Sequence, residues 1–172
     1  MSSLVLISRE IIVDSALVPI TGIDDTFSTY YLRCSHVGTS SNNGINIRVT
    51  SSGTGVSSSV YDSAGYNIQS SGKTNRGGTG NSQFQLFNNV SSNNFYSHGL
   101  NNWWIKATHM SDSSHYSYLL AYGQSETNAG NIWNMPQNGC VVKQAAAHDG
   151  FLVQGNGGAN IPMGTFSLYG ES

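Results

Sequence analysis

The stretch that most constrains the fold lies between Gly164 and Gly170, near the end of the chain. Hydrophobic and polar side chains alternate strictly there, with Phe166 and Leu168 on one side and Tyr169 on the other. A period of two is typical of a strand with one buried face. Because this strand ends the chain, we expect it to complete a sheet made from earlier strands. The sequence therefore predicts a fold held together by contacts between distant segments.

Similar runs occur along the whole chain, separated by connections rich in glycine, serine and asparagine. The clearest lies in 45–50, where Ile45, Ile47 and Val49 share one face. Only 144–148, with its three alanines, favours a helical turn, and no segment is long enough for a helix that crosses between parallel strands. Other expected strands are 4–14, 16–20, 28–37 (with Tyr30, Leu32, Cys34 and His36 on the core face), 83–87, 103–110, 116–122, 130–136, 139–142 and 150–155.

The predicted fold is a single all-β domain over residues 1–172, an antiparallel sandwich of two sheets with a jelly-roll-like arrangement of about eight strands. An immunoglobulin-like sandwich is the alternative. A chain of 172 residues is long enough for one well-filled domain and too short for two ordinary ones. The Gly- and Ser-rich segment 51–82 is predicted to be a long, partly ordered excursion, with 72–80 as its most mobile loop.

Charged residues are scarce: they make up 9% of the chain, where a typical soluble domain has about 25%. The formal net charge is −2 and the basic residues are scattered, so neither a nucleic-acid partner nor an anionic membrane is expected. No apolar stretch has the length of a secretory leader or a membrane span, so we expect synthesis in a cytoplasm and no membrane insertion. Cys34 and Cys140 are interpreted as buried free thiols, with one disulfide as the alternative.

Residues suited to a metal or catalytic site are few. His109, Asp112 and His115 lie across a predicted turn and offer three metal-ligand groups, but zinc motifs have tighter spacing or more ligands. We interpret them as surface turn residues and expect no metal and no cofactor. No Gly-x-Ser-x-Gly nucleophile turn occurs, and the acidic residues fall mostly in predicted turns. Enzyme activity is therefore not expected.

Aromatic residues are the more informative group for binding. Trp103 and Trp104 are neighbours in a predicted strand, so they point to opposite faces, and we expect a two-layer sandwich to bury only one of them. Aromatic side chains flanked by Asn, Gln and Ser are used both by sugar sites and by protein interfaces. The residues expected to contact a partner or a glycan are Trp104, Tyr116, Tyr118 and Trp133.

Short stretches along the chain resemble a family of small structural proteins of tailed phages, of the type found in cyanophages and other marine phages. They are LVLIS at 4–8, GIDDTFSTYYL at 22–32, QLFN at 85–88 and GTFSLYG at 164–170. The resemblance implies a protein of the virion, made in the host cytoplasm. It also implies association with copies of itself, as a homotrimer, and with phage capsid or tail proteins.

Two functions follow as expectations. The first is a capsid decoration or cement protein, since no coiled coil, anchor domain or catalytic set is evident in the sequence. The second is a tail-fibre or receptor-binding module that recognises glycans on the host surface, which the loop-borne Asn and aromatic residues also suit. We prefer the first because a fibre protein needs an attachment segment, whereas nearly all of this chain is used by the predicted sandwich.

Overall fold

The computed structural model describes residues 2–40, 44–69, 72–86, 101–126 and 132–172. In this part of the chain, thirteen strands and one short 3-10 turn, η1 (Asn156–Gly158), form two antiparallel sheets. The predicted all-β sandwich is confirmed. The helical turn expected at 144–148 is wrong: these residues form an irregular connection, because so short a run of alanines does not stabilise a helical nucleus.

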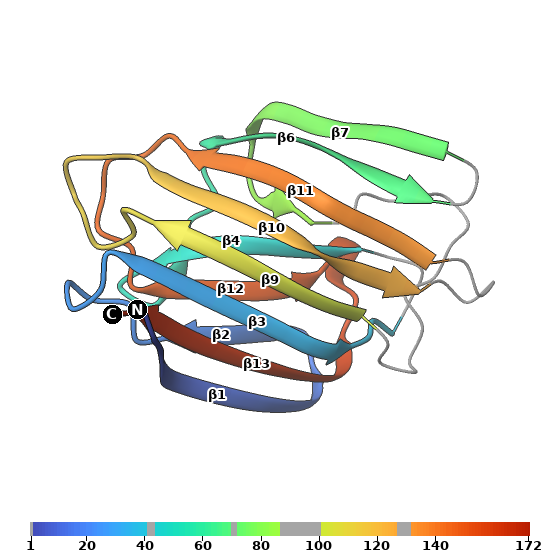
Figure 1. The fold of residues 1–172 in the computed structure, drawn as a ribbon, viewed down its shortest axis with the longest axis horizontal. Helices are drawn as coiled ribbons and strands as arrows, with labels where there is room; N and C mark the ends of the chain where they lie inside the picture. Colours follow the sequence, from blue (N-terminus) through green and yellow to red (C-terminus); the bar gives the residue numbers. More distant parts are fainter. Residues whose placement is uncertain (1, 41–43, 70–71, 87–100, 127–131) are drawn as a thin grey trace.

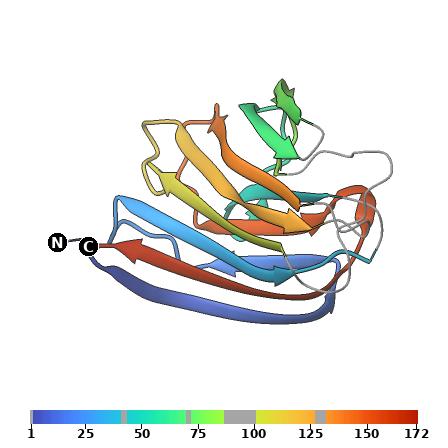
Figure 2. The same cartoon turned by 45° about the vertical axis from the view of Figure 1, so that its right-hand side comes forward.

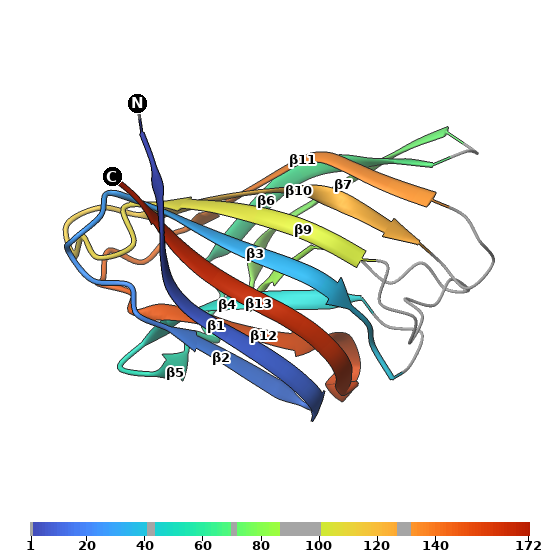
Figure 3. The same cartoon turned by 60° about the horizontal axis from the view of Figure 1, so that its bottom comes forward.

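The large sheet has eight strands, and the small sheet lies behind it in Figure 1. Figure 3 shows the two layers from another side. In pairing order, the large sheet contains β1 (Leu4–Ser15), β13 (Ile161–Glu171), β3 (Thr29–Val37), β9 (Asn101–Thr108), β10 (Ser117–Glu126), β11 (Ile132–Val142), β6 (Tyr61–Gln69) and β7 (Gly72–Asn81). The small sheet contains β2 (Leu17–Thr21), β12 (Gly150–Gly155), β4 (Ile45–Ser51) and β5 (Thr54–Gly55), and β8 (Phe84–Gln85) also pairs with β4.

The strand order is that of a jelly roll. One four-stranded half runs β1-β13-β3-β9 and the other runs β2-β12-β4-β8. If these eight strands are numbered along the chain, the two halves read 1-8-3-6 and 2-7-4-5, so that each pairs early strands with late ones. This order differs from that of an immunoglobulin-like sandwich. The remaining strands are additions, of which β10, β11, β6 and β7 widen the large sheet.

The last strand completes the fold as its alternation predicted. β13 lies between β1 and β3, and its Phe166 and Leu168 are fully buried. The two ends of the chain meet beside this strand (Figure 1), where the Ser3 N–H donates to the Ser172 carbonyl at 3.3 Å and the Ser172 N–H donates to the Ser3 carbonyl at 3.0 Å. Segments from opposite ends of the sequence, β1 and β13, therefore lie together at one edge of the large sheet.

The hydrophobic core lies between the two sheets. Its largest fully buried side chains include Trp103 from the large sheet and Phe151 from the small one. Ile45, Ile47 and Val49 all point inward, as predicted. His36 was expected on the core face but is exposed, because a register shift between Cys34 and Val37 interrupts the alternation and gives His36 a positive φ of 55°.

The Gly- and Ser-rich excursion is more regular than its composition suggests. β6 and β7 pair along most of their length, so the prediction of a mobile loop at 72–80 is wrong. Backbone hydrogen bonds to β6 hold β7 in place even though few of its side chains are apolar. Figure 2 shows that β6 and β7 carry the large sheet past the small one.

Both cysteines are free and buried, which confirms the interpretation from sequence. Burial in the apolar core raises the pKa of Cys34, and it raises the pKa of Cys140 to about 12. Neither thiol ionises near neutral pH, so both act as small hydrophobic side chains.

Candidate functional site

The Trp103-Trp104 pair shows which face of the large sheet is free. Trp103 is fully buried, and its Nε1–H donates to Ser125 Oγ at 3.1 Å. Trp104 lies on the opposite, outer face and is half-buried. Because the small sheet covers only one face of the large sheet, Trp104 stays at the surface. This is the side of β9 that was expected to meet a partner.

Trp104 belongs to a cluster on the outer face, which we call the aromatic face and define as Leu6, Tyr31, Trp104, Tyr122 and Tyr169. The register places Leu6 beside Tyr169, Tyr169 beside Tyr31, and Tyr122 beside Trp104 on neighbouring strands. The Trp104 ring centroid lies 6.4 Å from that of Tyr31 and 6.0 Å from that of Tyr169. Such edge-on and tilted contacts fix the rings relative to one another.

Two basic side chains cover parts of the aromatic face. The Arg33 guanidinium carbon lies 5.6 Å from the Trp104 ring centroid, and Lys106 Nζ lies 5.7 Å from that of Tyr31. At the edge of the cluster, the Tyr31 hydroxyl donates to Glu171 Oε2 at 3.1 Å. The face thus presents aromatic surface together with side chains of both charge signs. Such a surface suits a protein partner better than it suits a purely apolar ligand.

The outer face is hollowed in two places. A depression of about 250 Å³ lies among Leu4, Tyr31, Trp104 and Tyr122. A larger, open groove of about 720 Å³ crosses β9, β10, β11 and β6, with Lys106, Tyr118, Leu120 and Val141 among its lining residues. These hollows lie on the same side of the sheet as the aromatic face, so a partner that docks there has shape as well as ring surface to recognise.

The other aromatic residues expected to make contacts are placed less uniformly. Tyr118 is 49% exposed and lines the groove, whereas Tyr116 is 45% exposed and precedes β10. Trp133 lies in β11 and its backbone pairs with Ser125 of β10, but its side chain lies outside the described part of the structure. Of the four predicted residues, the structure thus places Trp104 and Tyr118 on one face.

Sequence reasoning did not select four members of the aromatic face: Leu6, Tyr31, Tyr122 and Tyr169. Tyr31 and Tyr169 alternate with residues that were predicted to point into the core, so the same pattern places both tyrosines on the outer face of their strands. It also missed the exposed edge of β1, where Ile11 is 73% and Val13 is 85% exposed. An apolar run reads as buried unless the edge position of its strand is known.

His109, Asp112 and His115 do come together on the turn between β9 and β10, with their ligand atoms within 4.8 Å of one another. Asp112 Oδ1 accepts the Ser114 N–H at 2.8 Å and the Ser114 hydroxyl at 2.6 Å, while Asp112 Oδ2 lies 2.6 Å from His115 Nδ1. The Ser114 and His115 hydrogen bonds hold the pKa of Asp112 well below its usual range. These contacts are those of a turn organised by an aspartate, which is the role interpreted from the sequence.

A serine-histidine contact lies inside the domain. Ser117 Oγ is 2.9 Å from His148 Nδ1 and donates to the His109 carbonyl at 3.0 Å; both side chains are fully buried. His148 Nε2 has no hydrogen-bond partner among the described residues. Because neither side chain reaches the surface, the pair anchors the turn before β10 to the segment before β12.

We expect the free energy of unfolding to fall as the pH is lowered from about 7.5 to about 5.5. Burial lowers the pKa of His148, an effect that exceeds the opposing attraction of Asp149. Below pH 6.5, the ordinary histidine pKa, the unfolded chain binds a proton that the folded chain does not, so stability is lost. Urea unfolding at several pH values across this range measures the slope of the free energy of unfolding against pH. His148→Gln should reduce it, whereas His36→Gln, at an exposed site, should leave it unchanged; an equal slope in all three proteins would contradict the prediction.

No protein-family model, curated protein or solved structure is significantly similar to this chain. Within the residues that the structure covers, no helix is long and apolar enough to cross a membrane.

Proposed function

We propose that the chain is a structural protein of a phage virion, made in the host cytoplasm, that associates with copies of itself to decorate or cement the capsid surface. The observation that carries the proposal is the aromatic face, where rings from four adjacent strands gather with part of their surface exposed. Exposed clusters of large apolar side chains mark interaction surfaces, and buried aromatic anchors supply much of the binding energy of protein interfaces. The resemblance of 22–32 and 164–170 to phage structural proteins supports the same setting.

The proposed assembly is a homotrimer, with capsid or tail proteins as its further partners. A closed ring forms when one surface of each copy meets a different surface of the next. The low charge of the chain favours such packing, because a net charge of −2 opposes the approach of further copies only weakly.

Light scattering of the purified chain during size exclusion tests the assembly. We expect a mass three times the 18.4 kDa of one chain. A monomer at all concentrations would contradict self-association. Particle imaging tests the location: density on the capsid lattice is expected, and density only at the tail tip would overturn the cementing role.

A receptor-binding role is the second candidate function, and the open groove favours it. The groove spans several strands, and Tyr118 offers a half-exposed ring in a lining that also contains Lys106 and Thr79, a combination that suits a host surface glycan. A glycan array with the folded chain tests this role. Binding that is lost in Tyr118→Ala and kept in Tyr116→Ala is the expected result, since Tyr116 is as exposed but lies outside the groove.

A further inference from the structure

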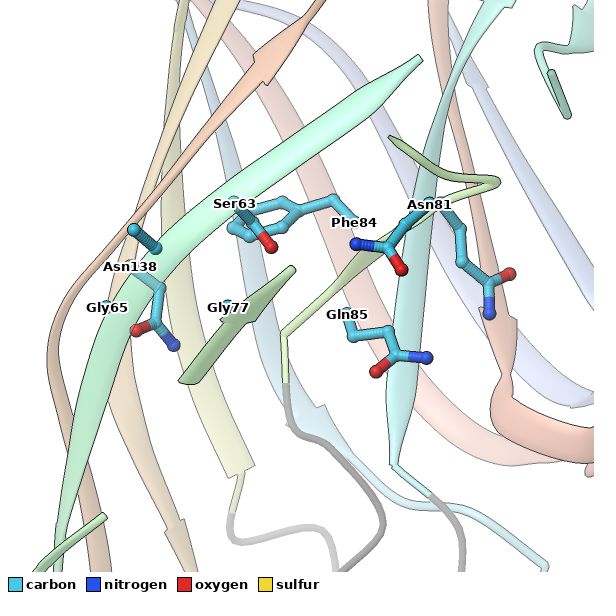
Figure 4. A pocket seen from close by; sticks show the side chains of 9 residues that line it. Ser63, Gly65, Gly77, Asn81, Phe84, Gln85 and Asn138 are labelled. Carbon is cyan, nitrogen blue, oxygen red and sulfur yellow. The ribbon is translucent and has the colours of Figure 1, made fainter. Parts of the chain in front are cut away.

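A small polar pocket lies where β6 and β7 pass the short strand β8 (Figure 4). It contains no residue of the aromatic face, it shares only Ser63 and Ala64 with the groove around Tyr118, and its volume is about 110 Å³. None of the described residues that line it is ionisable. The side chains that give the pocket its character are Ser63, Asn81, Gln83, Phe84, Gln85 and Asn138.

Asn138 is the most unusual of these residues. Its side chain is only 3% exposed, and its Oδ1 has no hydrogen-bond partner among the described residues. Its Nδ2 makes one long hydrogen bond, to the Leu86 carbonyl at 3.5 Å. Figure 4 shows the Asn138 amide between Gly65 and Gly77, on the same side of the pocket as the Ser63 hydroxyl. A buried amide with so few partners costs stability, so its presence in the core of a sheet points to a ligand.

The backbone is arranged to make room for this amide. A Cβ at Gly65 would overlap the Asn138 amide oxygen, so any other residue at position 65 would push the side chain away. The sheet thus contains a glycine directly beside a buried asparagine, and the amide takes the space that a side chain at position 65 would fill.

The other amides complete the lining. Gln83 Oε1 already accepts hydrogen bonds from Gln154 Nε2 at 2.8 Å and from Arg48 Nη2 at 3.3 Å, which fixes its amide and leaves its Nε2 as a donor. In Figure 4 the Asn81 amide points toward Ser63, and the Gln85 amide lies below Asn81. The pocket therefore offers donors and acceptors together, without charge, and its ligand must be neutral and able both to donate and to accept.

We propose that this pocket binds a sugar unit through an acetamido group, as in an N-acetylhexosamine. An acetamido group has one N–H and one carbonyl, which match the amide acceptors and donors of the lining, and its methyl group lies against Phe84. The volume corresponds to about three to four water molecules, so it takes a substituent of this size while the sugar ring remains at the mouth. The proposal does not depend on assembly through the aromatic face.

The test is a titration of the isotope-labelled full-length chain with the methyl glycoside of N-acetylglucosamine, followed by backbone amide shifts in solution NMR. Shifts at Ser63, Gln85 and Asn138 are expected. The dissociation constant should be about 1–10 mM, because a few neutral hydrogen bonds give only a weak affinity. The methyl glycoside of glucose, which lacks the acetamido group, should bind at least about tenfold more weakly.

Variants of the lining locate the site. Asn138→Leu is expected to weaken binding at least about tenfold and to keep or raise the midpoint of urea unfolding, because a similar volume replaces a buried amide that makes only one long hydrogen bond. Gln85→Ala, at the mouth of the pocket, should also weaken binding. It tests the site if Asn138→Leu does not fold. Gln137→Leu is the matched control, since Gln137 is exposed on the same strand and lies outside the pocket.

Three results would overturn the inference: no shift at the lining residues, equal binding of both glycosides, or unchanged binding in both lining variants. The experiment is repeated with Trp104→Ala, whose aromatic face is altered. Unchanged binding there is expected, and it separates a failure of the pocket from a failure of the proposed assembly.

Discussion

Trp103→Ala should destabilise the domain by about 3–5 kcal/mol, the usual cost of removing a fully buried tryptophan. The indole is 0% exposed, and its loss leaves both a large cavity and a Ser125 hydroxyl without the Nε1–H that it accepts. Domains of this size are stable by only about 5–15 kcal/mol, so the variant loses a large share of its stability. Urea unfolding followed by far-ultraviolet circular dichroism measures the change without relying on tryptophan fluorescence.

Trp103→Phe is the graded control for this prediction. It keeps an aromatic ring in the core and loses only part of the volume and one hydrogen bond, so its loss of stability should be clearly smaller. The prediction fails if Trp103→Ala unfolds at the same urea concentration as the unmodified chain. It also fails if Trp104→Ala, one residue away, costs as much stability in the separated subunits.

Trp104→Ala should instead weaken self-association, by about 30-fold or more in the dissociation constant, which corresponds to the roughly 2 kcal/mol of an aromatic anchor in an interface. Trp104 sits at the centre of the aromatic face, in contact with Tyr31 and Tyr169 and under Arg33, so its removal also leaves these neighbours unsupported. Sedimentation equilibrium over a range of concentrations measures the constant directly.

Two comparisons make this second prediction specific. Tyr116→Ala removes a more exposed ring that lies outside the aromatic face and should leave the dissociation constant unchanged. Far-ultraviolet circular dichroism should give the same spectrum for Trp104→Ala as for the unmodified chain. If Trp104→Ala assembles normally while remaining folded, the aromatic face is not the contact surface.

Much of the fold followed from the sequence because alternation reports directly on burial. Phe166 and Leu168 were expected on an inward face of a closing strand, and the strand lies between β1 and β3 with both side chains buried. The strand β7 was missed for the converse reason. Its sequence, GKTNRGGTGN, has no alternation of apolar residues, and what holds it is backbone pairing with β6, which is chemically the same for almost every residue.

The candidate surfaces were harder to predict than the core. Trp104 and Tyr118 were selected from the sequence and do share the outer face, but Tyr31 and Tyr169 joined them only once the strand order placed β3 beside β9 and β13 beside β3. The pocket around Asn138 had no signal in the sequence. Its residues come from β6, β7, β8, β11 and the link between β7 and β8, and polar side chains such as Ser63 and Gln85 are read as ordinary surface when their neighbours are unknown.

By itself, the sequence determined that this chain is an all-β domain and which side chains within a strand share a face, because successive residues of a strand point to opposite sides. The tertiary structure decided which of those faces is covered. Trp103 and Trp104 have the same chemistry and differ by one position, and only the small sheet packed against one side of β9 makes the first a core residue and the second a surface one. The polar pocket also depends on the tertiary structure, since its lining residues come from segments that are distant in the sequence.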